Sequence, residues 1–179
     1  MANYKNLRTE PPDHAVGRSR GGLSTKIHQL VDGHGLPLVV LVGAGQAGDA
    51  PMCPILLHHL RIARAGPGRP RTRPDAVRGD KAYSSRAIRG LLRSRGIRSC
   101  IPEPADQQGH RTRRGSQGGR PVGYDTEDYK GRNVVERAFN QDKQWRGLAT
   151  RYDKLATVYR AGAVLRAITL TLKRLGDTP

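Results

Sequence analysis

The chain has 179 residues, and its 32 Lys and Arg residues outnumber its 15 Asp and Glu residues, which sets the formal net charge at +17. So much positive charge attracts polyanions wherever the cations cluster, so nucleic acid is the first partner to consider. The sequence shows neither an apolar run long enough to cross a membrane nor a signal-peptide pattern, which argues against a membrane protein or a secreted one.

The first segments of the chain predict a basic lead-in followed by a β-hairpin. Pro11, Pro12 and the Gly/Arg run after them predict an extended, basic lead-in over residues 1–22 rather than a core element. Largely apolar segments at 23–32 and 36–45 flank the turn sequence Gly-His-Gly, as the two strands of a hairpin do. A single folded domain is therefore expected to begin at residue 23.

A short helix is predicted next. Residues 50–66 begin with Ala-Pro and end with Gly, which are typical helix boundaries, and a basic linker follows at 67–74. The two cysteines of the chain, Cys53 and Cys100, match no metal-ligand spacing. Their number and spacing indicate packing residues with reduced thiols, as in a cytoplasmic protein.

The following segments predict a strand–helix–strand unit. A short strand at 75–83 leads into a helix at 84–96, where Ser84 or Ser85 can cap the first turn. Another strand is predicted at 97–104. Because a helix separates the two strands, we expect them to be parallel and joined by a crossover.

The last third of the chain predicts a loop and two helices. Residues 105–123 are rich in Gln, Gly, Arg and Ser, which predicts a mobile basic loop. A helix is expected around 129–145 and a core helix at 148–175, where the domain ends. The predicted core stripe of that last helix recurs at steps of three or four residues and consists of Leu155, Val158, Gly162, Leu165, Ile168, Leu172 and Leu175.

Four polar residues of the helix around 129–145 share one face. At 100° per residue, Tyr129, Arg132, Glu136 and Lys143 fall within an arc of roughly 60°. The opposite side is apolar and includes Trp145, which we interpret as a core residue. Geometry alone leaves two interpretations open, a solvated face with an i,i+4 ion pair and a catalytic face.

A catalytic face of this kind needs a second carboxylate from another element. Metal-dependent phosphoryl transfer uses carboxylates from separate elements to hold two divalent cations that activate the attacking oxygen and stabilise the leaving oxygen. Asp80 is the best partner for Glu136, because it ends a predicted strand just before a helix start. The alternative interpretation of Asp80 is a residue of an ordinary turn.

Three segments together resemble a known family. The segment "DAVRGDKAY", the later "YKGRNVVERAFNQDKQWRGLATRYDKLA" and the early "GRSRGGLSTKIHQLVDGHGLPL" resemble the catalytic domain of bacterial insertion-sequence DDE transposases, in the group with a Tyr-x2-Arg-x3-Glu-x6-Lys signature. The resemblance implies an α/β, RNase H-like fold in which a mixed sheet is flanked by helices. It also implies that Asp80 and Glu136 are the second Asp and the Glu of the catalytic triad, ligating Mg²⁺ or Mn²⁺.

The resemblance also implies a DNA-binding set of residues. Arg132 and Lys143 would meet the DNA backbone, and Tyr129 would stack on a base or bond to a phosphate. Arg151 and Lys154 would continue this surface, although structural ion pairs with neighbours such as Asp153 explain them equally well. The partner would be insertion-sequence ends and target DNA in the cytoplasm at the bacterial nucleoid, with a homo-oligomer expected on the DNA.

The first Asp of the triad has no match. It belongs on a strand before the "GRSRGG" segment, and the chain is expected to lack that amino-terminal strand. Asp13, Asp32 and Asp49 sit in a lead-in, a strand end and a loop, so none is assigned the role. We therefore expect a truncated catalytic domain over 23–175 that needs an upstream part. The alternatives are a catalytically inactive DNA-binding remnant and, less suited to the carboxylates, a small RNA-binding protein.

Overall fold

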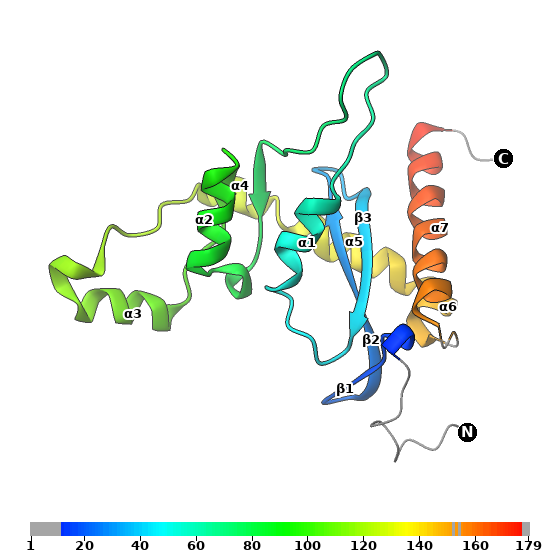
Figure 1. The fold of residues 1–179 in the computed structure, drawn as a ribbon, viewed down its shortest axis with the longest axis horizontal. Coiled ribbons are helices and arrows are strands. Elements are labelled where there is room, and N and C mark those ends of the chain that lie inside the picture. Colours follow the sequence, from blue (N-terminus) through cyan, green and yellow to red (C-terminus); the bar gives the residue numbers. More distant parts are fainter. Residues whose placement is uncertain (1–11, 152, 154, 177–179) are drawn as a thin grey trace. The chain divides into compact units, whose positions relative to one another are not determined.

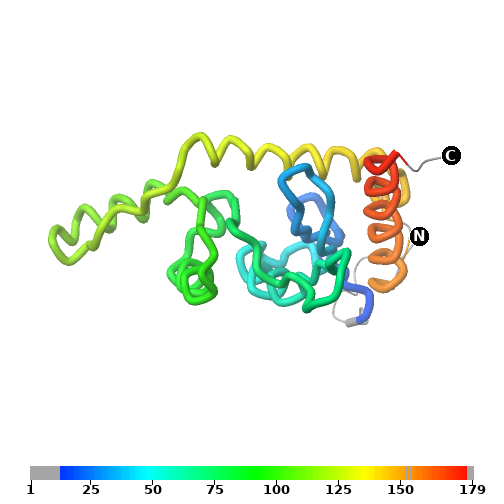
Figure 2. Tube along the Cα trace, turned by 90° about the horizontal axis from the view of Figure 1, so that it is seen from above, coloured from blue at the N-terminus to red at the C-terminus, as the bar shows by residue number. Residues whose placement is uncertain are grey.

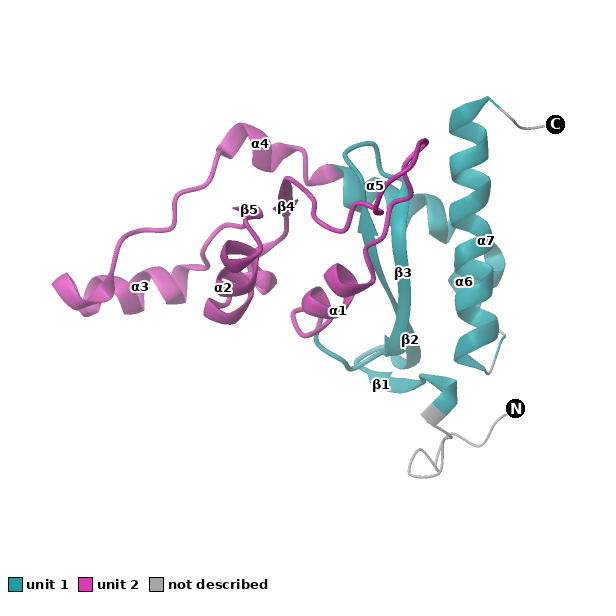
Figure 3. Ribbon diagram, turned by 45° about the horizontal axis from the view of Figure 1, so that its top comes forward, with its two compact units in different colours: residues 1–48, 134–179 teal, residues 49–133 magenta. Residues whose placement is uncertain are grey.

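The computed structural model describes residues 12–151, 153 and 155–176. It divides into two compact units, of which unit 1 comprises the described residues of 1–48 and 134–179, and unit 2 comprises 49–133 (Figure 3). Helices and strands occur in both units, which confirms the predicted α/β class. None of the helices in the described residues combines the length and apolar character that a membrane crossing needs.

The sheet of unit 1 is antiparallel and three-stranded. Its strands are β1 (Gly17–Ser19), β2 (Gly22–Val31) and β3 (Pro37–Ala44), in the order β1-β2-β3 (Figure 1). The predicted hairpin is confirmed, since β2 and β3 pair from Thr25 opposite Ala44 to Val31 opposite Pro37.

The predicted lead-in over residues 1–22 is wrong at its end. Gly17 pairs with Ser24, so β1 is part of the sheet, and a short 3-10 helix, η2 (Pro12–His14), precedes it. The reason is that the Gly-rich turn between β1 and β2 allows a tight reversal, with Gly22 at a φ of +106°. Residues 1–11 of the lead-in lie outside the described residues.

The helices of unit 1 are α5 (Asn133–Lys143), α6 (Arg146–Thr150) and α7 (Ala156–Leu175), and α7 packs against β3 (Figure 1). The buried core between them contains Val40, Leu148, Tyr159 and Ala163. Trp145 packs against this core, as predicted. The Tyr159 hydroxyl donates to the Leu148 carbonyl at 2.8 Å, so a buried polar group of the core has its partner.

The prediction for the last helix is wrong in two respects. The chain breaks between α6 and α7, where Arg151 has a left-handed φ of +42°. Six of the seven residues in the predicted core stripe are exposed, among them Leu165 at 58% and Leu175 at 73%. The buried face contains Tyr159 and the small Ala163 instead, because a small side chain lets the helix approach the sheet closely. Periodicity identifies an apolar stripe but does not say which neighbour covers it.

The core of unit 2 includes the predicted parallel crossover. Strand β4 (Ala76–Arg78) pairs in parallel with β5 (Arg98–Cys100), and α2 (Arg86–Ser94) connects them. The Ser85 hydroxyl accepts from the backbone N–H of Ile88 at 3.1 Å, which confirms one of the two predicted caps. The two sheets formed by the described residues lie in different units, so the RNase H-like arrangement with one mixed sheet stays a prediction.

The helix predicted at 50–66 is shorter in the structure. Helix α1 (Met52–His59) is followed by Leu60, whose backbone is extended, and the chain then forms an irregular loop. Ile62 and Arg71 close this loop with two backbone hydrogen bonds of 2.9 and 2.8 Å. The basic linker therefore begins earlier than the composition indicated.

The predicted mobile loop at 105–123 is wrong for most of its length, up to residue 118. Helix α3 (Ala105–Arg113) and a 3-10 turn, η4 (Gly115–Gly118), occupy it, and the chain then returns toward α4 (Thr126–Lys130) (Figure 2). Gln107 anchors α3, because its amide donates to the Ser84 carbonyl at 2.7 Å. Arg111 pairs with Glu103, and the cations gather at the end of the helix where its dipole favours them.

Candidate active site

Asp80 lies where the sequence predicted it, just beyond the carboxyl end of β4. It precedes a 3-10 turn, η3 (Lys81–Tyr83), and its Oδ1 accepts from the backbone N–H of Ala82 at 2.9 Å. This hydrogen bond satisfies an N–H of the turn and restricts the carboxylate. Because Asp80 is exposed, the carboxylate is accessible to a cation or a substrate.

The pKa of Tyr83 depends in part on the negative charge of Asp80. Burial is the largest cause, and together with the negative charges of Asp49 and Asp80 it raises the pKa of Tyr83 to about 12. The folded protein therefore keeps this phenol protonated at pH values where an unfolded chain loses the proton, above about 10. The stability that results is complete below pH 10 and is lost as pH rises toward 12.

Replacing Asp80 by Asn is expected to lower the pKa of Tyr83, because one neighbouring negative charge disappears. The measurement is an alkaline titration of tyrosinate absorbance, with Tyr83→Phe identifying the signal of this residue. Asp75→Asn is the matched control, since Asp75 is exposed and pairs with Arg71. An unchanged Tyr83 titration in Asp80→Asn would show that this carboxylate does not act on Tyr83.

The helix predicted around 129–145 is two helices in the structure. Helix α4 ends at Lys130, a turn covers 131 and 132, and α5 begins at Asn133. Tyr129 and Arg132 form a local pair in unit 2, with the Arg132 guanidinium carbon 5.8 Å from the centre of the Tyr129 ring. An aromatic ring beside a cation is suited to a nucleotide, which offers a base to stack on and a phosphate to bind.

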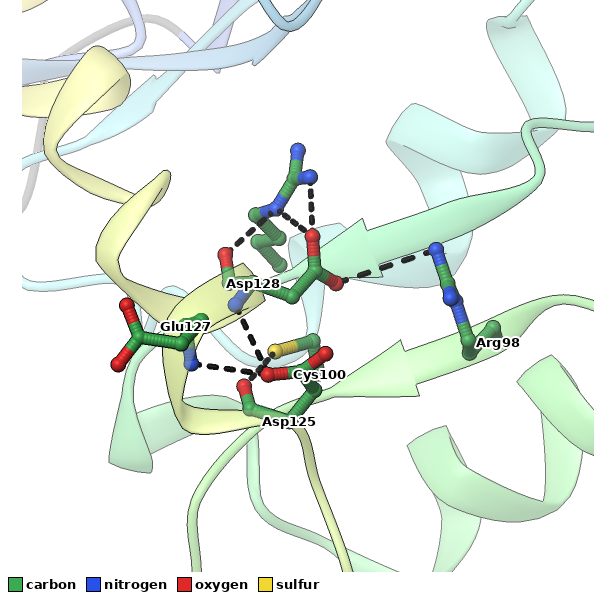
Figure 4. Close-up of polar contacts among 6 residues, drawn as sticks. Arg98, Cys100, Asp125, Glu127 and Asp128 are labelled. Atoms are coloured by element: carbon green, nitrogen blue, oxygen red, sulfur yellow. Dashed lines mark hydrogen bonds and ion pairs between the residues drawn. The ribbon is translucent and has the colours of Figure 1, made fainter.

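An ion pair that the sequence reading missed holds α4 on β4 (Figure 4). Arg78 Nε donates to the Asp128 carbonyl at 2.9 Å and to its Oδ1 at 3.0 Å, and Arg78 Nη2 also bonds to Oδ1. Arg98 Nη2 lies 4.0 Å from Asp128 Oδ2. Since Arg78 is two residues before Asp80 and Asp128 directly precedes Tyr129, this pair positions two of the predicted site residues within one unit. The sequence offered one signal for this ion pair, which is that Arg78 and Asp128 carry opposite charges and each lies close to a predicted site residue.

The cap of α4 strengthens the same attachment. Asp125 Oδ1 accepts from the backbone N–H groups of Glu127 and Asp128 at 2.9 and 3.1 Å, and the Cys100 thiol donates to the Asp125 carbonyl at 3.4 Å (Figure 4). Burial raises the pKa of Cys100, so the thiol stays protonated and acts as a donor. Cys100 is therefore a packing residue, as predicted.

Replacing Asp128 by Asn is expected to loosen α4, because Arg78 loses a charged acceptor. The hydrogen bond from Arg78 lowers the pKa of Asp128, so the stabilisation is present above about pH 4 and is lost as pH falls through the folded pKa. Hydrogen exchange over residues 126–130 measures the effect. Glu127→Gln is the matched control on the same helix, since its pair with Lys130 is exposed and contributes little. Equal exchange in both variants would contradict the positioning role.

Glu136 and Lys143 share a face of α5. Glu136 lies in the first turn, where the helix dipole favours an anion, and Lys143 lies in the last turn, where it favours a cation. Their separation of seven residues places them nearly in line along the helix, and both are exposed. The face predicted from the sequence is therefore present on α5 for these two residues.

Arg151 makes internal contacts. Its Nη2 donates to the His14 carbonyl at 2.5 Å, and its guanidinium carbon is 5.0 Å from the centre of the Tyr159 ring. These contacts tie the start of unit 1 to the break between α6 and α7, so Arg151 has a structural role, and its DNA contact stays a prediction. Lys154 lies outside the described residues.

The two predicted metal ligands lie in different units. Asp80 belongs to unit 2 and Glu136 to unit 1, so their convergence stays a prediction. Over residues 12–151, 153 and 155–176, the structure has no group of three or more His, Cys, Asp or Glu side chains that could hold a metal ion. Carboxylate oxygens are nevertheless the ligands that Mg²⁺ prefers, so the chemistry of Asp80 and Glu136 suits this ion.

Residues 5–172 match the family described as the transposase DDE domain. The chain belongs to this family. No curated protein and no solved structure matches it. The match confirms the resemblance to insertion-sequence DDE transposases, while the particular signature group stays a prediction.

The matched range of this DDE domain covers parts of both units and contains every predicted site residue. The family implies DNA as the partner, and DDE transposases generally use divalent metal ions. Exposed carboxylates, such as Asp80 after β4 and Glu136 in the first turn of α5, are groups that a divalent metal ion can bind.

Proposed function

We propose that this DDE domain takes part in DNA transposition by Mg²⁺-dependent (or Mn²⁺-dependent) strand cleavage and strand transfer, with Asp80 and Glu136 as metal ligands. The observation that carries the proposal is the family match over 5–172, which includes both carboxylates. The exposed position of Asp80 at the carboxyl end of a parallel strand supports it, because ligands of α/β folds bind at that edge.

Each residue of the proposed site has a task. Bound divalent ions supply Lewis-acid activation of the attacking oxygen and stabilisation of the leaving oxygen. Asp80 presents a carboxylate that its bond to Ala82 N–H orients, and Glu136 presents one from the first turn of α5. Lys143, on the same face of α5, holds a DNA phosphate, and the Tyr129–Arg132 pair holds a nucleotide near the cleaved bond.

The proposal includes an RNase H-like arrangement of the two units and assembly of a homo-oligomer on insertion-sequence ends at the bacterial nucleoid. Asp80 and Glu136 are two of the three carboxylates that the family resemblance implies, and we assign the third to no residue of this chain.

Iron-directed backbone cleavage tests whether the two carboxylates share a metal. Fe²⁺ replaces Mg²⁺ at oxygen sites, and with ascorbate and peroxide it produces hydroxyl radicals that cut the nearest backbone. Two sets of fragments are expected, with ends near residues 80 and 136, and excess Mg²⁺ should suppress both.

The variants sharpen this experiment. Asp80→Asn should reduce cutting near residue 136 as well as near residue 80, because a shared ion loses one of its ligands. Asp106→Asn removes an exposed carboxylate on α3 and should leave both sets of fragments unchanged. Cutting near only one of the two residues would reject the proposal that they share a metal ion.

A second candidate function is DNA binding without catalysis. The formal net charge of +17 supports it. A chain of this kind binds duplex DNA with strong salt dependence and does not cleave it in Mg²⁺.

A further inference from the structure

The residues that line a basic cleft in unit 1 include none of those predicted to meet DNA. The turn between β2 and β3, the end of α5 and the last turns of α7 form its walls, and Figure 2 shows α5 reaching α7. Its volume is about 290 Å³. The polar side chains that line it are His34, Gln141, Gln144, Arg166, Lys173 and Arg174.

We propose that this cleft binds a phosphate group of the DNA backbone. Three basic side chains, those of Arg166, Lys173 and Arg174, line a space large enough for one phosphate and its adjoining sugars. Guanidinium and ammonium groups are the usual phosphate ligands of proteins, and amide N–H groups such as those of Gln141 and Gln144 add neutral donors. The inference rests on the proposed function only in taking DNA as the partner.

Arg166 is held in place by the fold. Its Nη2 donates to the Gln141 carbonyl at 3.3 Å, and its guanidinium carbon lies 5.4 Å from the centre of the Trp145 ring. Its Nε is buried and has no hydrogen-bond partner among the described residues. A cation fixed by a carbonyl and an aromatic ring loses little entropy when it binds an anion, so it is a prepared donor.

The acidic residues near the cleft, Asp142 and Asp32, accept hydrogen bonds from other groups of the protein. Asp142 attracts Arg166, but it is buried and accepts from Gln29 Nε2 at 2.5 Å, and burial raises its pKa. Asp32 accepts from the backbone N–H groups of His34 and Leu36 at 2.8 and 2.9 Å. At the end of α7, the Gly176 N–H caps the carbonyls of the last turn. The cleft itself is lined by no Asp or Glu within the described residues.

The lining of the cleft favours a polymer backbone over a free nucleotide. The described lining contains no Phe, Tyr or Trp on which a base could stack, and its apolar residues are Leu36 and Leu170. A ligand recognised only through phosphate therefore fits the cleft, and DNA presents phosphates at its surface regardless of sequence.

Gln144→Glu tests the proposal with a matched control. It places one negative charge in the cleft, and Gln46→Glu makes the same change at an exposed residue beyond the other end of β3. The eight residues of β3 span roughly 26 Å, well beyond a Debye length of about 8 Å, so Gln46→Glu changes net charge without affecting the cleft.

Binding to a fluorescent duplex is measured by anisotropy in EDTA at several salt concentrations, with circular dichroism as the folding check. Gln144→Glu should weaken binding about tenfold and lower the salt slope by about 1, while Gln46→Glu should weaken it less than about twofold. Lys173→Gln with Arg174→Gln should lower the slope by about 2. Equal weakening of DNA binding by Gln144→Glu and by Gln46→Glu would overturn the proposal. So would a Gln144→Glu variant that binds pyrophosphate more weakly than the parent chain but binds DNA with the same affinity.

The proposed metal site and the proposed phosphate-binding cleft can be tested independently. Because the binding assay contains no free divalent metal, its result does not depend on Asp80 or Glu136 holding an ion. Glu136→Gln should retain the cleft-dependent DNA affinity even if the chain cleaves nothing. Loss of the difference between Gln144→Glu and Gln46→Glu would therefore count against the cleft alone.

Discussion

Replacing Glu136 by Gln is expected to lower Mg²⁺-dependent nicking of supercoiled plasmid DNA by about 100-fold or more. The amide has the size of the carboxylate but no charge, so it is a poor ligand for a hard divalent cation. Loss of an outer-shell partner already costs about 10-fold to 100-fold in metal affinity or activity, and a direct ligand should cost at least as much. Asp80→Asn should have an effect of similar size.

The control is chosen to match the change in charge. Glu127→Gln also removes one exposed carboxylate, in α4, but we assign Glu127 no metal ligation, so nicking should persist. DNA affinity in EDTA should not fall in Glu136→Gln, since the variant removes a negative charge. Equal nicking by this variant and the parent chain rejects the catalytic role of Glu136.

Replacing Leu148 by Ala is expected to destabilise unit 1 by about 2–5 kcal/mol, the usual cost of emptying a buried leucine site. Leu148 is 7% exposed and belongs to the cluster with Tyr159 and Val40. Small domains have only about 5–15 kcal/mol of stability, so this loss is large. Urea unfolding measures it, and Trp145, the single tryptophan, reports on unit 1 because it packs against the same cluster.

Leu165→Ala removes the same atoms from an exposed position of α7 in the same unit. At 58% exposure the residue has little burial to lose, so the cost should stay within about 0.5 kcal/mol. The periodicity of the sequence predicted the reverse, with Leu165 in the core stripe. Destabilisation by Leu165→Ala as large as that by Leu148→Ala would show that this face of α7 is covered in solution.

Local signals of the sequence predicted several features correctly. The β2–β3 hairpin follows from two apolar runs around a Gly-containing turn, and the β4–α2–β5 crossover follows from a capping Ser between two short strands. Asp80 at a strand end and Glu136 on an exposed helical face could be placed because each position depends on neighbours within a few residues. Features set by backbone geometry over short distances can be read along a chain.

The attachment of α4 and the formation of α3 depend on distant partners. Arg78 and Asp128 are 50 residues apart, and their opposite charges alone do not show that these two residues pair. Helix α3 forms in a segment of loop-like composition because Gln107 and Arg111 find partners at Ser84 and Glu103. Favourable contacts of this kind override weak local preferences, so composition alone mispredicts such segments.

The family, the α/β class and the local positions of Asp80 and Glu136 are thus readable from residue order, because a motif and a hydrophobic period are properties of neighbouring residues. The buried face of α7 and the convergence of Arg166, Lys173 and Arg174 with Gln144 are not. They arise when elements distant in the chain pack together, and packing selects among faces that have similar patterns in the sequence.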